Sequence, residues 1–166
     1  MHVGSGGMFV QSLKFIEEHS ENAFDISVYG QESNPTTWKL AKMNLAVHGL
    51  EGKILEGNTF YEDKHELIGK CDYVMANPPF NVDGVDSEKI KGDPRLPFGI
   101  PGVNKKTKAV SNGNYLWIQY FHQYLNEKGR AGFVMASSAS DAGYGEKDVR
   151  EQLVKTGDVD VMVAIG

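Results

Sequence analysis

Two consecutive prolines, Pro78 and Pro79, place the tightest constraint on how this chain can fold. They follow an apolar run, Cys71–Ala76, that is typical of a buried strand. Each proline lacks a backbone N–H donor and fixes its own φ, and the residue before a proline is pushed to extended geometry. The stretch Asn77-Pro78-Pro79-Phe80 therefore predicts a rigid, extended ledge where the strand ends. Its carbonyl acceptors and aromatic ring suit a planar group that carries an amino group, such as an extruded adenine, although a turn with Phe80 as a core plug is the alternative.

A cluster of small residues, Gly4-Ser5-Gly6-Gly7, comes directly before a predicted helix, in which Phe9, Leu13 and Ile16 recur at helical spacing. Glycines at the start of a helix let the backbone approach a ligand closely, and the free N–H groups of the helix face that ligand. The pattern is not the G-x-G-x-x-G fingerprint of dinucleotide-binding proteins. A flexible N-terminal tag is the alternative, but the immediate start of the helix favours a binding loop.

Polar side chains end the next two predicted strands. The strand at residues 26–32 ends in Glu32, and an acid at this place in a doubly wound fold can accept hydrogen bonds from ribose hydroxyls. The strand at residues 53–59 contains Asn58 near its end, whose amide could contact a nucleobase edge. The alternatives are an exposed charge at Glu32 and a turn cap at Asn58.

Short strands alternate with helices along the whole chain, which predicts an α/β fold with a doubly wound parallel sheet and helices on both faces. Asn34 is the predicted N-cap of a helix with Pro35 in its first turn. The apolar residues expected to form the buried face of that helix are Trp38, Met43, Ala46, Val47 and Leu50. The later elements are expected to be a helix at 115–125 with an aromatic core face, a strand at 130–136, a helix at 145–155 and a strand at 159–166.

The segment 81–113 interrupts this alternation. It contains three prolines, several glycines and a slight excess of basic over acidic residues. A long connection without periodicity is usually functional or disordered. We expect a flexible insertion that lies over the candidate site and becomes ordered around DNA or a target base.

The glycine-rich opening, Gly30-Gln31-Glu32 and Asn77-Pro78-Pro79-Phe80 together resemble the class I S-adenosylmethionine-dependent methyltransferases. The resemblance is closest to the adenine-specific DNA methyltransferases, and within these to the modification subunit of type I restriction-modification systems. It covers essentially the whole chain, so residues 1–166 are expected to form a partial, Rossmann-like methyltransferase domain.

What the resemblance implies is methyl transfer from S-adenosyl-L-methionine to the exocyclic amino group of a flipped adenine in DNA. The implied cofactor-binding residues are His2, Val3, Gly4, Ser5, Gly6, Glu32 and Asn58, and the implied catalytic residues are Asn77, Pro78, Pro79 and Phe80. No metal is needed for this chemistry. The implied partners, besides DNA, are the specificity and restriction subunits of a type I complex.

The chain also departs from the pattern of that family. The strand that normally precedes the glycine loop is absent, and so is an upstream cofactor-binding segment, while the strand expected at 159–166 is cut off at its end. We therefore expect a catalytic-domain fragment that is truncated at both ends. Two alternatives stay open: a glutamine methyltransferase of release factors, whose similar ledge ends in tyrosine, and a catalytically incompetent fragment that serves only as a folding or interaction module.

Composition fits one domain of a cytoplasmic protein. The 166 residues contain no long apolar stretch, one cysteine and five histidines without ligand-like pairing, so neither a membrane span, an intrachain disulfide nor a metal site is expected. The net charge of −5 argues against strong nonspecific DNA binding by this chain alone. We expect its phosphate contacts to come in part from a partner subunit or from regions beyond this chain.

Overall fold

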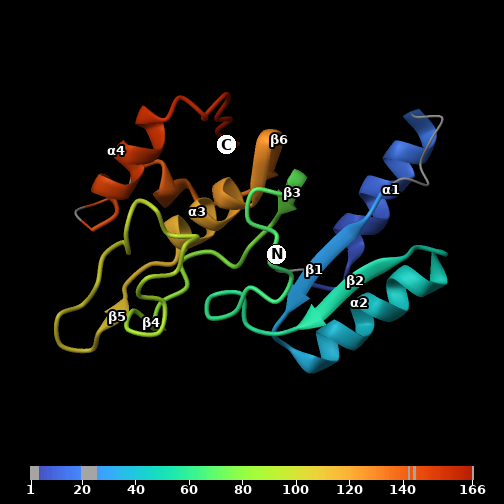
Figure 1. Ribbon diagram of the computed structural model, residues 1–166, viewed down its shortest axis with the longest axis horizontal. Helices are drawn as coiled ribbons and strands as arrows, with labels where there is room; N and C mark the ends of the chain where they lie inside the picture. The colour runs from blue at the N-terminus through green and yellow to red at the C-terminus, as the bar shows by residue number, and fades with distance from the viewer. Residues whose placement is uncertain (1–3, 20–25, 142, 144, 166) are drawn as a thin grey trace. The chain divides into compact units, whose positions relative to one another are not determined.

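A computed structural model describes residues 4–19, 26–141, 143 and 145–165 of the chain. The chain divides into two compact units, Met1–Glu66 and Leu67–Gly166, and each contains a pair of parallel strands (Figure 1). Within the described ranges, no helix is long and apolar enough to cross a membrane.

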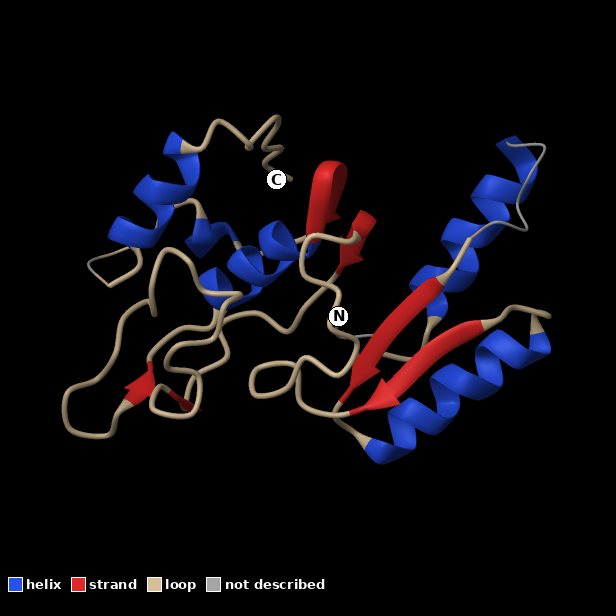
Figure 2. Cartoon of the chain, viewed as in Figure 1, coloured by secondary structure: helices blue, strands red, loops and turns tan. Residues whose placement is uncertain are grey.

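The first unit is built around a strand–helix–strand crossover (Figure 2). Strand β1 (Val28–Glu32) runs parallel to β2 (Gly52–Glu56), and helix α2 (Pro35–Val47) connects them. A crossover of this kind is needed because two parallel strands cannot be joined by a tight turn. Helix α1 (Gly7–His19) precedes β1 and packs against α2.

Helix α2 begins where the sequence predicts. The Asn34 side chain accepts hydrogen bonds from the backbone N–H groups of Thr36 at 2.9 Å and Thr37 at 3.1 Å, and Pro35 occupies the first turn. The predicted buried face is partly wrong, because Met43 and Val47 are 63% and 81% exposed and Ala46 is exposed as well. The core of this unit is instead formed by Val10, Ala41, Leu45 and Ile54, with Phe9, Trp38 and Leu50 packed around them.

The second unit repeats the parallel arrangement. Strand β3 (Cys71–Ala76) has the bounds that the sequence predicts, and it pairs in parallel with β6 (Leu125–Phe133). Helix α3 (Asn114–Tyr124) packs against both strands, and helix α4 (Lys147–Lys155) packs against α3. A single 3₁₀ turn, η2 (Ser137–Ala139), follows β6.

The aromatic face of α3 is core, as predicted. Trp117, Tyr120, Phe121 and Tyr124 are all at most 7% exposed. The rings of Trp117 and Phe121 stack with centroids 6.1 Å apart, and Phe121 also contacts Phe133 of β6 at 5.2 Å. These rings anchor α3 on the β3–β6 pair.

The segment 81–113 contains a small hairpin and a buried anchor. Strands β4 (Val85–Asp86) and β5 (Ala109–Val110) pair antiparallel. Arg95 is 2% exposed, forms a bidentate ion pair with Asp93 and lies over the Tyr120 ring at 4.2 Å. Although burial opposes its charge, the hydrogen bonds that Arg95 donates to Asp93 and to the Tyr124 hydroxyl outweigh this cost and raise the pKa of Arg95 above its ordinary value. Our expectation that this segment is flexible stays a prediction. Within the segment, we expect the chain around the buried Arg95–Asp93 pair to be the most rigid part.

One predicted strand is not formed. Residues 159–165 have no strand partner, and their apolar side chains Val159, Val161, Met162, Val163 and Ile165 are 50–88% exposed. A strand needs a partner for its backbone hydrogen bonds, so the apolar composition of this segment did not suffice to predict one. Among the described residues the β1–β2 and β3–β6 pairs are also separate sheets.

Candidate functional site

Glu32, the last residue of β1, brings together two of the motifs found in the sequence. Its side chain is only 2% exposed. One carboxylate oxygen accepts from the backbone N–H of Gly4 at 3.1 Å, and the other accepts from the backbone N–H of Asn34 at 2.9 Å. The glycine loop, the end of β1 and the start of α2 therefore meet at one carboxylate, and the alternative of an exposed charge is wrong.

The glycine loop lies closely against α2. Gly6 has a φ of +80°, and a Cβ atom at this position would lie 3.4 Å from the backbone of Ala41. The Asn44 side chain, one turn further along α2, donates to the carbonyl of Ser5 at 3.1 Å and also holds the loop on this helix. The left-handed φ favours glycine at residue 6, and the loop is in van der Waals contact with α2, so it is a structured part of the fold and not a tag. The two other predicted loop residues, His2 and Val3, lie outside the described residues.

Asn58 lies in the turn that follows β2, close to Glu32 along the sheet edge. The backbone N–H of Gly57 donates to the Glu32 carbonyl at 2.9 Å. The Asn58 side-chain oxygen accepts from the backbone N–H of Phe60 at 3.0 Å, which is the turn cap that we kept as the alternative. The residue is exposed, so the cap and a ligand contact through the rest of the amide are compatible.

A residue that the sequence analysis missed fixes the turn after Asn58. Gln31, next to Glu32 on β1, is 2% exposed. Its amide donates to the Glu62 carbonyl at 3.0 Å and accepts from the backbone N–H of Lys64 at 3.2 Å. A polar side chain inside a short buried strand was the available signal, because such a group must find partners when it is buried.

The Asn77–Phe80 ledge lies in the second unit, at the carboxyl end of β3. The last ladder bond runs from the backbone N–H of Val134 to the Ala76 carbonyl at 3.1 Å, and the chain leaves the sheet at the next residue. Pro78 is buried, whereas Asn77 and Pro79 are exposed and Phe80 is 43% exposed. The alternative of Phe80 as a core plug is therefore wrong, since its ring is available at the surface.

Four further polar residues hold the chain directly after Phe80, and none of them was predicted. Asn81 has a φ of +53°, and its backbone N–H donates to the side-chain oxygen of Asn114 at 2.9 Å. Its side-chain oxygen accepts from Asn114 at 3.0 Å, from Ser138 at 3.0 Å and from Asn112 at 3.2 Å. This group, the Asn81 cluster, joins the ledge to the start of α3 and to the turn after β6.

The turn that carries Ser138 is itself tied to α3. The Tyr115 hydroxyl donates to the Ala139 carbonyl at 2.7 Å. Burial raises the pKa of Tyr115, with Glu146 raising it further and Arg150 opposing the shift. The hydroxyl therefore stays protonated and keeps donating, which holds Ser138 within reach of Asn81.

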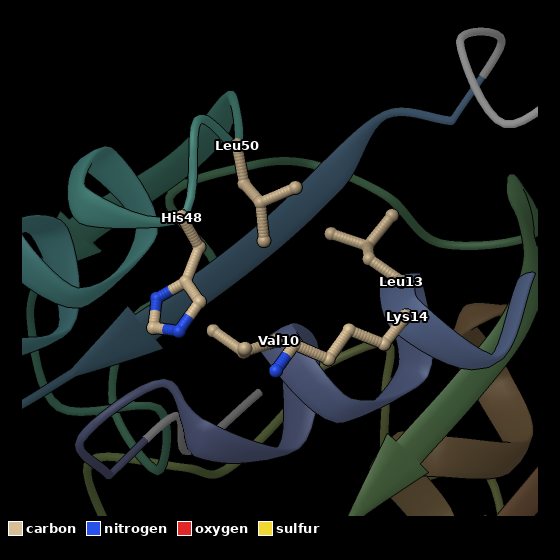
Figure 3. A pocket seen from close by; sticks show the side chains of 5 residues that line it. All are labelled: Val10, Leu13, Lys14, His48 and Leu50. Carbon is tan, nitrogen blue, oxygen red and sulfur yellow. The ribbon is translucent and has the colours of Figure 1, made fainter. Parts of the chain in front are cut away.

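The structure also contains a small hollow between α1 and the end of α2, lined by Val10, Leu13, Lys14, His48 and Leu50 (Figure 3). None of the predicted site residues lines it, so it is separate from the candidate site. Over the described ranges, no group of three or more His, Cys, Asp or Glu side chains is placed to hold a metal ion.

The model of a protein family described as "N-6 DNA Methylase" matches residues 1–166, which is the whole chain. The chain belongs to the N-6 DNA methylase family. A relative from Methanocaldococcus jannaschii, named "Type I restriction enzyme MjaIX methylase subunit", is 41% identical over 155 residues. That alignment covers 92% of this chain but 27% of the relative, so the chain spans about a quarter of that protein's length.

Solved structures of methyltransferases share the fold. The methyltransferase subunit of a type I restriction-modification system from Streptococcus thermophilus superposes with a TM-score of 0.80 at 24% identity, over 96% of this chain and 33% of its own. A putative class I S-adenosylmethionine-dependent methyltransferase from Listeria monocytogenes gives a TM-score of 0.70 at 15% identity, over 93% and 43%. At these identities the likeness establishes the fold, which is that of the class I methyltransferases, as the sequence predicted.

Proposed function

We propose that this chain carries the methyl-transfer site of an adenine-specific DNA methyltransferase, the modification subunit of a type I restriction-modification system. The observation that carries the proposal is the Asn77–Phe80 ledge, exposed at the carboxyl end of a parallel strand in a member of the N-6 DNA methylase family. Ligands of open α/β sheets bind at the carboxyl ends of the strands. Family membership favours adenine over the glutamine side chain of a release factor.

The chemistry requires acceptors at the ledge. The exocyclic amino group of adenine is a poor nucleophile, because its lone pair is delocalised into the ring. The Asn77 side-chain oxygen and the Pro78 carbonyl would each accept one amino hydrogen, which directs the lone pair toward the methyl donor. Positioning and electrostatic complementarity then supply most of the effect. Stacking of the flipped base on Phe80 contributes roughly 1–3 kcal/mol, by analogy with bases stacked on aromatic rings in single strands.

The residues around Glu32 fit S-adenosylmethionine. Three of the four loop residues, Gly4, Gly6 and Gly7, have no side chain, so mainly backbone would face the methionine part of the cofactor. A carboxylate offers about four acceptor positions, so Glu32 can hold the Gly4 and Asn34 N–H groups and also accept from a ribose hydroxyl. Asn58 would lie near the cofactor's adenine. The bound cofactor would supply an electrophilic methyl group on a sulfonium, and no metal is required.

DNA contact would involve the hairpin of the 81–113 segment. Lys105, Lys106 and Lys108 are exposed at its tip. The Asn104 side chain accepts from the backbone N–H groups of Lys106 at 2.9 Å and Thr107 at 3.2 Å, so the tip has a defined shape. Three lysines on a fixed tip, in a chain of net charge −5, would provide phosphate contacts beside the target base. We further propose the cytoplasm as the location, and the specificity and restriction subunits of a type I complex as partners.

The proposal is tested by measuring methyl transfer to DNA with Asn77→Ala. The protein that carries this chain, co-expressed with the products of the neighbouring genes, is incubated with labelled S-adenosylmethionine and DNA, and N6-methyladenine is quantified. We expect Asn77→Ala to abolish the product while cofactor affinity stays within a few-fold, since Asn77 would contact the target base and not the cofactor.

A matched control is available at the opposite end of the same strands. Asn126, at the start of β6, donates to Asp72 at 2.8 Å, and Asn126→Ala should leave methylation within about threefold. No N6-methyladenine with the wild-type protein, survival of activity in Asn77→Ala, or an equal loss of cofactor affinity would each contradict the proposal.

A further inference from the structure

We infer that Asn114 is a positioning residue for the Asn77–Phe80 ledge, acting through Asn81; this rests on the proposed function. Asn114 lies in the first turn of α3, and its side chain is 0% exposed. A fully buried amide next to an exposed ledge needs a reason, because burial of a polar group is costly unless it is hydrogen-bonded. All of its side-chain hydrogen bonds described above are made to Asn81, the residue that follows Phe80.

The two bonds between Asn114 and Asn81 fix the direction of the chain. Asn114 accepts from the Asn81 backbone N–H at 2.9 Å and donates to the Asn81 side-chain oxygen at 3.0 Å. Because the Asn81 N–H can bond only to an oxygen and the Asn81 side-chain oxygen can bond only to an N–H group, the two bonds fix the orientation of the Asn114 side-chain amide. One side chain thus holds both the backbone and the side chain of Asn81.

Asn81 needs this support because of its backbone conformation. Its φ of +53° lies in the left-handed region, which asparagine tolerates better than most residues but which still costs free energy. The chain turns at Phe80 and Asn81, so a change of φ at Asn81 would reorient Phe80, the residue before it. The Asn81 cluster therefore sets how the Phe80 ring is presented to a flipped base.

Asn81 also receives donors from two other segments. Asn112 and Ser138 donate to the same side-chain oxygen that accepts from Asn114, at 3.2 Å and 3.0 Å. Three donors converge on this oxygen, and a carboxylate would serve them at least as well as an amide oxygen does. We therefore expect the cluster to tolerate aspartate in place of Asn81 but not in place of Asn114.

The test compares Asn114→Asp with Asn81→Asp. Asn114→Asp places a carboxylate oxygen against the Asn81 side-chain oxygen and loses the donor, so we expect kcat for methyl transfer to fall roughly 30-fold with unchanged cofactor affinity. Asn81→Asp keeps all three incoming bonds and a residue that accepts positive φ, so kcat should stay within about threefold. Both variants add the same charge to the same cluster, and each therefore controls for the other.

Backbone hydrogen exchange measures how firmly the chain is held at Asn81, independently of catalytic activity. In Asn114→Asp, backbone exchange at Asn81 and Val82 should accelerate about tenfold or more, while Asn81→Asp should match the wild type. Ser138→Ala removes one exposed donor without disturbing the core, so it covers the case in which Asn114→Asp fails to fold. We expect kcat to fall roughly five- to tenfold, beyond the threefold range of the control variants, with the melting temperature lowered by at most about 4 °C.

The outcomes separate this inference from the proposed function. Unchanged exchange at Asn81 in Asn114→Asp, or an unchanged kcat in both Asn114→Asp and Ser138→Ala, would overturn the positioning role. A wild-type protein that binds the cofactor but never methylates adenine would overturn the proposed function. The claim that the Asn81 cluster positions the ledge for methyl transfer would then fail as well. Accelerated exchange together with a selective loss of kcat supports both.

Discussion

At the scale of a single residue, Glu32 is central to the fold around the proposed cofactor site. Its carboxylate is buried, accepts the N–H groups of Gly4 and Asn34, and ends the strand on which a ribose would lie. The sequence predicted that Glu32 ends a strand, and its contact with a ribose stays a prediction. It did not predict the contact with Gly4, which lies 28 residues away in the chain.

Glu32→Gln should weaken cofactor binding more than tenfold. A glutamine has one side-chain oxygen where the carboxylate has two, so one of the two backbone N–H groups would face an NH₂ group. Hydrogen bonds to a charged acceptor contribute about 1.5–3 kcal/mol each, which corresponds to roughly a 10- to 100-fold change in affinity if the loop loosens. Calorimetric titration with S-adenosylmethionine measures the effect.

Glu56 supplies the matched control for this experiment. It lies directly opposite Glu32 in the β1–β2 register, at the end of the neighbouring strand, and it is exposed. Glu56→Gln should leave the affinity unchanged. Equal affinities for both variants would show that Glu32 does not hold the cofactor.

The Asn81 cluster shows why part of the candidate site could not be predicted. Asn114 and Ser138 lie 33 and 57 residues from Asn81 in the chain, and no local pattern links them. The ledge itself was predictable, because proline restricts the backbone at its own position whatever surrounds it. Contacts between residues far apart in the chain depend on how α3 and β6 pack, and local patterns in a single sequence do not reveal this packing.

At the scale of elements, the sequence predicted what local chemistry determines. The bounds of β3, the start of α2 at Pro35 and the aromatic core face of α3 all follow from prolines, caps and periodicity. The 81–113 hairpin has strands of only two residues, too short for any periodicity. Its anchor is a buried charge, Arg95, whose burial depends on Asp93 and on two tyrosines of α3.

The lysines at the hairpin tip should contribute to the salt dependence of DNA binding. Each phosphate contact made by a lysine adds about 0.9 to the slope of log K against log salt. Lys105→Gln with Lys106→Gln should therefore reduce that slope by about 1.8. Lys108 is left unchanged, because its φ of +57° and its backbone bonds help to close the hairpin. Fluorescence anisotropy with labelled DNA over a salt series gives the slope.

A second double variant controls for the change in net charge. Lys39 on α2 and Lys128 on β6 are exposed, and Lys39→Gln with Lys128→Gln removes the same two charges elsewhere. This control should keep the wild-type slope. If both double variants lower the slope equally, the effect comes from net charge and the hairpin tip makes no specific contact.

At the scale of the whole molecule, the strand pairs determine how the chain should behave in solution. Within the part of the chain that the structure describes, β1 pairs only with β2, and β3 pairs only with β6. Two-stranded sheets are marginally stable, and an open strand edge recruits other chains. On β3 the open edge adjoins exposed apolar side chains, since Tyr73 is 76% and Met75 is 44% exposed.

We therefore expect the 166-residue chain to self-associate through β3. Sedimentation velocity should show an average mass that rises with concentration in the wild type and stays monomeric in Tyr73→Lys with Met75→Lys, because charged side chains on an exposed strand oppose pairing. Met43→Lys with Val47→Lys, which changes two exposed apolar residues on α2, should associate like the wild type. Association that is lost only in the α2 variant would assign it to a helix surface, and a wild type that is monomeric throughout would mean that the β3 edge is protected in solution.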